Sequence, residues 1–219
     1  MNIALFGGTF DPIHTGHLRA AQVAARRFRL DRILFVPSGN PPHKRRDRLT
    51  PFIHRFAMVA LACQQNPRFV PSLLEAPRIG RRPHYSIDTV RGVRKSLKPT
   101  DKLYFLLGLD AFLDLPHWKS YRHLFEVMDF IVVSRPGFGS QEILKVVPAP
   151  SGRSAISGWA DNPRATNTRK RTVHILRGVH APVASRDIRE AVAARRLVTG
   201  LVPPLVEEYI GKEGLYVIG

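Results

Sequence analysis

Short apolar segments that alternate with longer helix-forming segments constrain the fold of this chain most. The apolar segments predict strands at residues 3–6, 32–36, 69–74, 103–107, 127–133 and 172–176. Helices are predicted at residues 16–28, 51–65, 86–97, 185–195 and 204–210. Strands that are apolar throughout are buried on both faces, which is typical of parallel sheets joined by right-handed helical crossovers. The sequence therefore predicts an α/β fold with a parallel sheet between two layers of helices.

The length of the chain is that of a single domain. With 219 residues, of which 44% are hydrophobic, it can form one core at a typical ~150 residues per domain. We therefore predict one domain over residues 1–219. Residues 137–171 are rich in Gly, Pro, Ser, Asn and Arg, which predicts a mobile insertion within that domain.

Several classes of protein are excluded by what the sequence lacks. A single cysteine, Cys63, excludes an intrachain disulfide framework and a multi-cysteine zinc site. No segment approaches the ~18 consecutive apolar residues that span a bilayer. The first residues lack the basic region of a signal peptide. We therefore expect no membrane association and a cytoplasmic location.

The charge of the chain is strongly positive. Lys and Arg number 34 against 17 Asp and Glu, a formal net charge of +17. Local basic runs occur at residues 44–46 and 169–171. Such a charge suits nucleic acid, a membrane surface or a polyphosphate ligand. Because no nucleic-acid-binding motif or set of interleaved aromatic residues accompanies it, nucleic-acid binding is the less favoured alternative.

The segment GGTFDPIHTGHL, residues 7–18, joins the first predicted strand to the first predicted helix. Gly7 and Gly8 let the backbone approach a ligand closely, and the start of a helix offers free N–H groups and a positive dipole end. His14 and His17 are three residues apart and can converge as donors to a phosphate, with added charge if they are protonated. Since no cysteine or acidic residue completes a metal set beside them, no protein-held metal is expected.

This segment resembles a known family. His14-Thr15-Gly16-His17 resembles the HxGH signature of the nucleotidyltransferase superfamily. The longer string is similar to that of the bacterial nicotinate-mononucleotide adenylyltransferases. The resemblance implies a Rossmann-like doubly wound sheet, here with C-terminal helices. It also implies condensation of ATP, carried with Mg²⁺, and nicotinate mononucleotide into nicotinate adenine dinucleotide and pyrophosphate.

Further segments match motifs of this family in the same order along the chain. Residues 36–44 resemble VPxxxPPHK, residues 85–90 resemble Y[ST]xxTL, residues 108–118 resemble GxDxxxxLxxW, and residues 134–137 resemble the family's RPG turn. Residues 183–189 depart from the usual ISSTxIR, because Ala184 and Arg186 replace hydroxyl residues. Arg186 can supply charge in place of the lost hydroxyl.

The resemblance implies site residues by motif position. The implied catalytic residues are His14, His17 and Arg189. The residues implied to bind ATP and its phosphates are Gly7, Gly8, Thr9, Phe10, His43, Lys44, Gly108, Asp110, Arg135 and Ser185. Those implied to bind nicotinate mononucleotide are Ser86, Thr89 and Trp118.

Structural roles compete with these assignments at several positions. Thr50 and Ser185 are predicted N-caps of their helices, and helix capping also explains Ser86 and Thr89. Trp118 suits a core as well as a pyridine ring. Another phosphorylated acceptor, such as phosphopantetheine, remains an alternative substrate. The sequence leaves the oligomeric state open and is compatible with a homo-oligomer.

Overall fold

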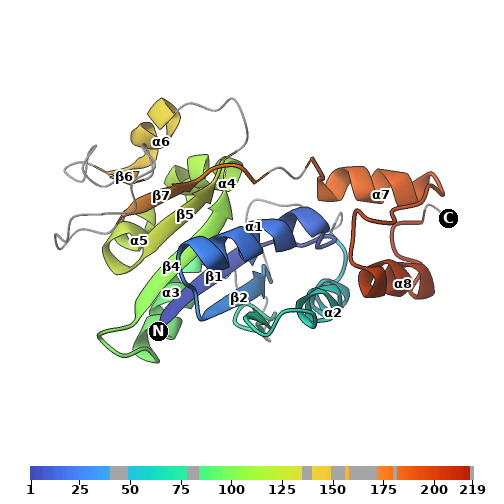
Figure 1. Cartoon of the computed structure of the whole chain (residues 1–219), viewed down its shortest axis with the longest axis horizontal. Coiled ribbons are helices and arrows are strands. Elements are labelled where there is room, and N and C mark those ends of the chain that lie inside the picture. The colour runs from blue at the N-terminus through green and yellow to red at the C-terminus, as the bar shows by residue number, and fades with distance from the viewer. Residues whose placement is uncertain are drawn as a thin grey trace.

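A parallel sheet forms the centre of the computed structural model, which describes residues 1–39, 49–77, 84–134, 140–148, 156–157, 172–179 and 182–217. The strand order is β3-β2-β1-β4-β5-β7-β6, and every pairing is parallel (Figure 1). The strands are β1 (Asn2–Gly8), β2 (Arg32–Pro37), β3 (Phe69–Pro71), β4 (Lys102–Gly108), β5 (Asp129–Val133), β6 (Ile156–Ser157) and β7 (Val173–Leu176).

Helices connect the strands and cover both faces of the sheet. They are α1 (Thr15–Arg27), α2 (Phe52–Cys63), α3 (Ser86–Lys95), α4 (Leu109–Leu113), α5 (Tyr121–Val127), α6 (Ser140–Val146), α7 (Ser185–Ala193) and α8 (Pro204–Lys212), with a 3₁₀ turn at Leu115–His117. In Figure 1, α1 crosses the near face of the sheet, and α7 and α8 lie together at one end of the molecule.

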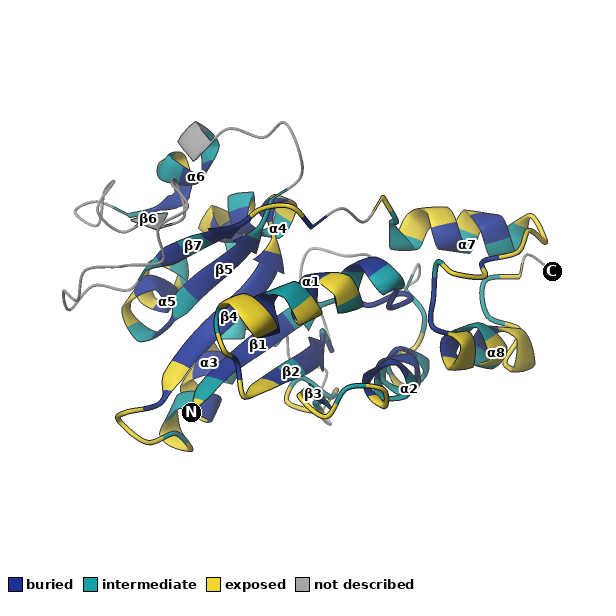
Figure 2. Cartoon of the chain, viewed as in Figure 1, coloured by how far each residue is buried: buried dark blue, intermediate teal, exposed yellow. Residues whose placement is uncertain are grey.

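Two hydrophobic cores form because successive side chains of a strand point to opposite faces. Ala4 and Phe6 of β1 belong to the first core, which α1, α2, α7 and α8 cover. Ile3 and Leu5 belong to the second core, which α3 to α6 cover. Figure 2 shows the central strands buried and the outer sides of the helices exposed. The expected doubly wound architecture is confirmed.

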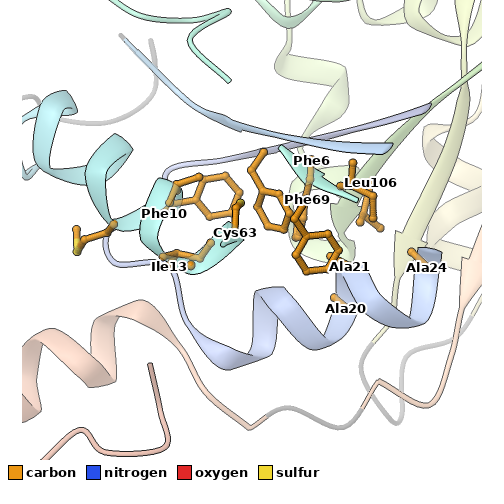
Figure 3. Close-up of a cluster of buried hydrophobic side chains, with 14 of the residues drawn as sticks. Phe6, Phe10, Ile13, Ala20, Ala21, Ala24, Cys63, Phe69 and Leu106 are labelled. Atoms are coloured by element: carbon orange, nitrogen blue, oxygen red, sulfur yellow. The ribbon is translucent and has the colours of Figure 1, made fainter. Parts of the chain in front are cut away.

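Small residues of α1 allow this helix to lie close to the sheet. Figure 3 shows Ala20, Ala21 and Ala24 opposite the aromatic rings of Phe6 and Phe69. The first core thus joins aromatic side chains of the sheet to the short side chains of α1.

The order of the strands reverses at β1. The chain passes from β1 to β2 on one side, and later returns to place β4 on the other side of β1. In open parallel sheets, ligands bind beyond the carboxyl ends of the strands at such a switch point. Gly7 and Gly8 end β1 there, and Gly108 ends β4.

The predicted elements are present, with changes at their ends. The strand predicted at residues 127–133 begins only at Asp129, because α5 extends to Val127. The predicted N-cap Thr50 is wrong, since α2 begins at Phe52 with Pro51 as its cap. The carbonyl of Thr50 instead accepts a hydrogen bond of 2.9 Å from Nε of Arg55. Sequence reasoning did not predict α4, α5, α6 or β6.

Most of the described residues in the predicted insertion (137–171) have regular structure. They include α6 and β6, and Ile143 and Val146 of α6 are buried in the second core. The rest of this segment lies outside the described residues, and its mobility stays a prediction. Among the helices that the structure describes, none is long and apolar enough to cross a membrane.

Truncating Phe130 tests the second core. This β5 side chain is fully buried and packs against the rings of Phe112 and Phe125, with centroids 5.6 and 4.6 Å away. Phe130→Ala should lower the free energy of unfolding by about 3–5 kcal/mol, because it removes these contacts and leaves a cavity. Leu197→Ala, at a side chain that is 87% exposed, is the control and should change it by under about 0.5 kcal/mol. Equal losses in urea unfolding would contradict this core.

Candidate functional site

A glycine and a buried aromatic ring shape the loop after β1. Phe10 has a left-handed backbone, with φ of 50°, and its ring packs 5.5 Å from Phe6 and 5.0 Å from His17, between centroids. A Cβ on Gly8 would lie 2.9 Å from the Phe10 ring, closer than real Cβ atoms come. Glycine at this position therefore lets the ring fold back under the loop, which turns towards α1.

His14 and His17 form a reciprocal cap at the start of α1. Nδ1 of His14 accepts from the backbone N–H of His17 at 3.4 Å, and Nδ1 of His17 accepts from that of His14 at 3.3 Å. The two rings are stacked, with centroids 3.7 Å apart. In a neutral imidazole only one nitrogen accepts, so each ring carries its proton on Nε2. The cap thus leaves two Nε2–H groups as donors.

Both imidazoles are neutral near pH 7. Burial lowers the pKa of His14 to about 4, partly opposed by the negative charge of Asp187. Burial lowers the pKa of His17 well below its usual value, and the neighbouring His14 lowers it further. The condition under which the rings would add charge, protonation, is therefore not met near pH 7 in the unliganded protein. An imidazolium would lose the Nδ1 acceptor of the cap and would carry a charge into an apolar setting.

Arg189 and Ser185 of α7 both reach the loop after β1. Nη1 of Arg189 donates to the carbonyl of Asp11 at 2.6 Å, and the hydroxyl of Ser185 donates to the carbonyl of Pro12 at 2.9 Å. The structure therefore brings Arg189 and the two histidines to one loop. Ser185 is not the predicted N-cap of α7, because Ala184 occupies that position and the Ser185 hydroxyl is bonded elsewhere.

Arg186, which replaces a hydroxyl residue of the motif, points to a different set of partners. Its Nε lies 3.8 Å from a carboxylate oxygen of Asp187 and 3.6 Å from one of Glu190. All three side chains are exposed. The charge of Arg186 is thus shared with acidic neighbours on its own helix.

Of the remaining residues predicted to bind ATP, the structure describes only some. Gly108 caps α4 at the carboxyl end of β4, and Asp110 lies in the first turn of that helix, both exposed. His43, Lys44 and Arg135 lie outside the described residues.

The residues predicted to bind nicotinate mononucleotide lie beside the second core. Ser86 begins α3, and the hydroxyl of Thr89 donates to a carboxylate oxygen of Glu75 at 2.9 Å. Burial raises the pKa of Glu75, and the hydrogen bond from Thr89 opposes that rise. Trp118 is half-buried, with its ring edge-on to Phe105 of β4, and its Nε1 donates to Asp114 at 3.2 Å. The capping role considered for Ser86 and Thr89 is wrong, since Tyr85 is the N-cap of α3 and its side chain makes no capping bond.

Sequence reasoning missed three side chains that contact the loop: Asp11, Arg55 and Tyr216. Asp11 gives no signal of its own, because an aspartate followed by a proline is common in ordinary turns. Arg55 did give a signal, since it is the one charged residue among apolar neighbours in Phe52–Cys63 apart from a histidine. Nothing in the sequence near Tyr216 links it to residue 11.

The part of the chain that the structure describes contains no cluster of side chains that could bind a metal ion. No group of three or more His, Cys, Asp or Glu side chains there could hold an ion. The loop instead offers N–H donors and a guanidinium, which are groups that bind anions.

The chain is similar to known proteins over most of its length. The cytidylyltransferase-like family matches residues 5–191. A probable nicotinate-nucleotide adenylyltransferase of Solibacter usitatus is 39% identical over 216 residues, covering 99% of this chain and 100% of its own. Its counterpart in Desulfotalea psychrophila is 35% identical over 216 residues, covering 98% of this chain and 99% of its own.

A solved structure shares the fold over nearly the whole chain. Nicotinic acid mononucleotide adenylyltransferase of Plasmodium falciparum, complexed with NaAD, aligns with a TM-score of 0.72 and 21% identity. The alignment covers 98% of this chain and 97% of the other.

The neutral state of His14 predicts a loss of stability in acid. The unfolded chain takes up a proton near pH 6.5 and the folded ring only near pH 4, so stability falls as pH falls through this window. Between pH 7 and pH 5 the loss from this group should be on the order of 2 kcal/mol. His14→Asn keeps a residue suited to capping and should remove that part of the loss, measured by urea unfolding at both pH values.

Leu197→Ala provides the control, because Leu197 is 87% exposed and its side chain does not titrate. It should leave the pH dependence of the wild type unchanged. A wild type and His14→Asn variant with equal losses between pH 7 and pH 5 would contradict the neutral assignment of His14.

Proposed function

Because this chain belongs to the cytidylyltransferase-like family, and within it to the nicotinate-nucleotide adenylyltransferases, we propose that it transfers the adenylyl group of MgATP to nicotinate mononucleotide. The products are nicotinate adenine dinucleotide and pyrophosphate, which places the reaction in NAD biosynthesis. The observation that carries the proposal is the convergence of His14, His17 and Arg189 on one loop at the switch point.

The reaction needs no protein nucleophile. A phosphate oxygen of the mononucleotide, already anionic, attacks the α-phosphorus of ATP in line with the leaving group. The new P–O bond forms as the bond to pyrophosphate breaks, and the pyrophosphate leaves with the bonding electron pair. Catalysis then consists of positioning the two substrates and stabilising the charge that develops on the phosphoryl oxygens.

The loop after β1 is suited to stabilising that charge. The neutral rings of His14 and His17 donate hydrogen bonds through their Nε2–H groups. The guanidinium of Arg189 supplies the positive charge. The amides at the start of α1 add partial positive charge. Mg²⁺ enters as part of the nucleotide substrate and shields the triphosphate.

We assign the ATP phosphates to the backbone of residues 7–10 and to Ser185. Gly108 and Asp110 are assigned to the same nucleotide, with the Asp110 carboxylate accepting from ribose hydroxyls. We also assign to ATP, on their sequence motifs alone, His43, Lys44 and Arg135. Nicotinate mononucleotide is assigned to Ser86, Thr89 and Trp118. The hydroxyl proton of Thr89 points to Glu75, so in this arrangement Thr89 presents lone pairs to a ligand and backbone N–H groups must bind the nicotinate carboxylate.

Release of pyrophosphate from MgATP tests the choice of acceptor. Nicotinate mononucleotide, nicotinamide mononucleotide and phosphopantetheine are supplied in parallel. We expect the fastest release with nicotinate mononucleotide, together with formation of the dinucleotide. Release only with phosphopantetheine would overturn the proposed acceptor, and no release with any of the three would overturn adenylyl transfer itself.

Loss of one imidazole donor should be costly. His17→Ala removes an N–H group aimed at developing charge, and we expect kcat to fall at least ~100-fold, as when one oxyanion donor is lost. His123→Ala, at an exposed site on α5, is the control and should keep wild-type turnover. Steady-state assays on folded protein decide the matter: near-normal turnover in His17→Ala would remove His17 from the mechanism.

A further inference from the structure

Asp11 is a buried carboxylate with both oxygens bonded to other parts of the chain. Only 3% of this residue is exposed. Its Oδ1 accepts from the hydroxyl of Tyr216 at 2.8 Å, and its Oδ2 accepts from the backbone N–H of Thr50 at 3.3 Å. The carboxylate therefore links the loop after β1 to the segment before α2 and to the tail that follows α8.

Arg55 supports the same loop from α2. It is 2% exposed, and its Nη1 donates to the carbonyl of Thr9 at 2.8 Å while its Nε donates to that of Thr50 at 2.9 Å. Burial lowers the pKa of Arg55, and the charge of Asp11 opposes this. Arg55 thus fixes Thr50, which in turn holds Asp11.

Tyr216 reaches Asp11 from the C-terminal tail by an unusual backbone path. Its φ is 67°, a left-handed conformation that tyrosine adopts at a cost, and Gly214 two residues earlier has φ of 58°. Such a conformation persists where the surroundings fix it. The hydrogen bond from the Tyr216 hydroxyl to Asp11 is one contact that fixes this conformation. Burial and the nearby charge of Asp11 raise the pKa of Tyr216.

We propose that Tyr216 is a positioning residue, which holds Asp11 so that residues 9–11 keep the shape that receives the ATP phosphates. The proposal rests on the function proposed above for this loop. Phe10, beside Asp11, is itself left-handed, so the loop is held in a conformation that it would otherwise adopt less often. Tyr216 touches no reacting atom in this account and acts through Asp11.

The proposal predicts which kinetic constant changes. If only a fraction of molecules has the receptive loop, apparent affinity for ATP falls by that fraction. Saturating ATP shifts the population to the receptive conformation of the loop, so kcat is unchanged. Loss of the hydroxyl should therefore raise KM for ATP and leave kcat and the KM for the acceptor nearly unchanged.

Tyr216→Phe is the test variant, because it removes the hydroxyl and keeps the ring. We expect KM for ATP to rise about tenfold, from the loss of one buried hydrogen bond, with kcat within about twofold of wild type. Tyr209→Phe is the matched control. Its hydroxyl is bonded to Nδ1 of His54 at 2.9 Å, which joins α8 to α2, and its loss should leave KM for ATP unchanged.

Amide hydrogen exchange of residues 9–11 tests the proposal without any reaction. We expect faster exchange in Tyr216→Phe than in wild type and in Tyr209→Phe, with no change in β4. Unchanged exchange at these amides would overturn the proposal, as would an unchanged KM for ATP. A wild type that forms no dinucleotide would instead contradict the proposed function, and the exchange comparison would still decide the role of Tyr216.

Discussion

The loop between β1 and α1 depends on hydrogen bonds that distant parts of the chain supply to its carbonyl groups. Those of Gly8, Thr9, Asp11 and Pro12 accept, in turn, from Ser38, Arg55, Arg189 and Ser185. A buried carbonyl without a donor costs about 1–3 kcal/mol, so the loop keeps its path only when α2 and α7 are in place. The packing of the first core therefore sets the geometry of the candidate site, and the site forms with the fold rather than on its surface.

Electrostatics at the site separate hydrogen-bond donation from positive charge. His17 lies against the rings of Phe6 and Phe10, and His14 stacks on His17, so a charged imidazole at either position would be poorly solvated. Their reciprocal cap settles which nitrogen carries the proton, and leaves both Nε2–H groups as donors. In the proposed function, the positive charge comes from the guanidinium of Arg189. In the proposed function, a triphosphate would meet donors that are fixed before it binds, which lowers the cost of reorganisation in the transition state.

Local sequence was sufficient to predict the sheet, most helices and the loop that leads into α1. It failed where a tertiary contact decides. Ser185 was expected to cap its own helix, yet its hydroxyl bonds a carbonyl 173 residues away. Thr50 failed for a similar reason, since Arg55 uses its carbonyl and Asp11 its N–H group.

The contact of Tyr216 and the position of α5 were harder to predict from the sequence. The Tyr216 bond to Asp11 spans 205 residues, and no periodicity or spacing encodes such a separation. The strand β5 was predicted too long because Val127 and Met128 are apolar, whereas they end α5 and lead into the strand. Whether each site residue has the role that its motif implies stays a prediction.

The protonation of the two imidazoles tests most directly whether His14 and His17 act as neutral hydrogen-bond donors. Nitrogen-15 NMR of the histidine side chains near pH 7 reports which ring nitrogen carries the proton. We expect neutral rings with the proton on Nε2 for both His14 and His17, and a change at both Nε2 signals when a non-hydrolysable ATP analogue binds. A proton on Nδ1, a charged ring in the unliganded protein, or Nε2 signals that ignore the nucleotide would contradict this expectation.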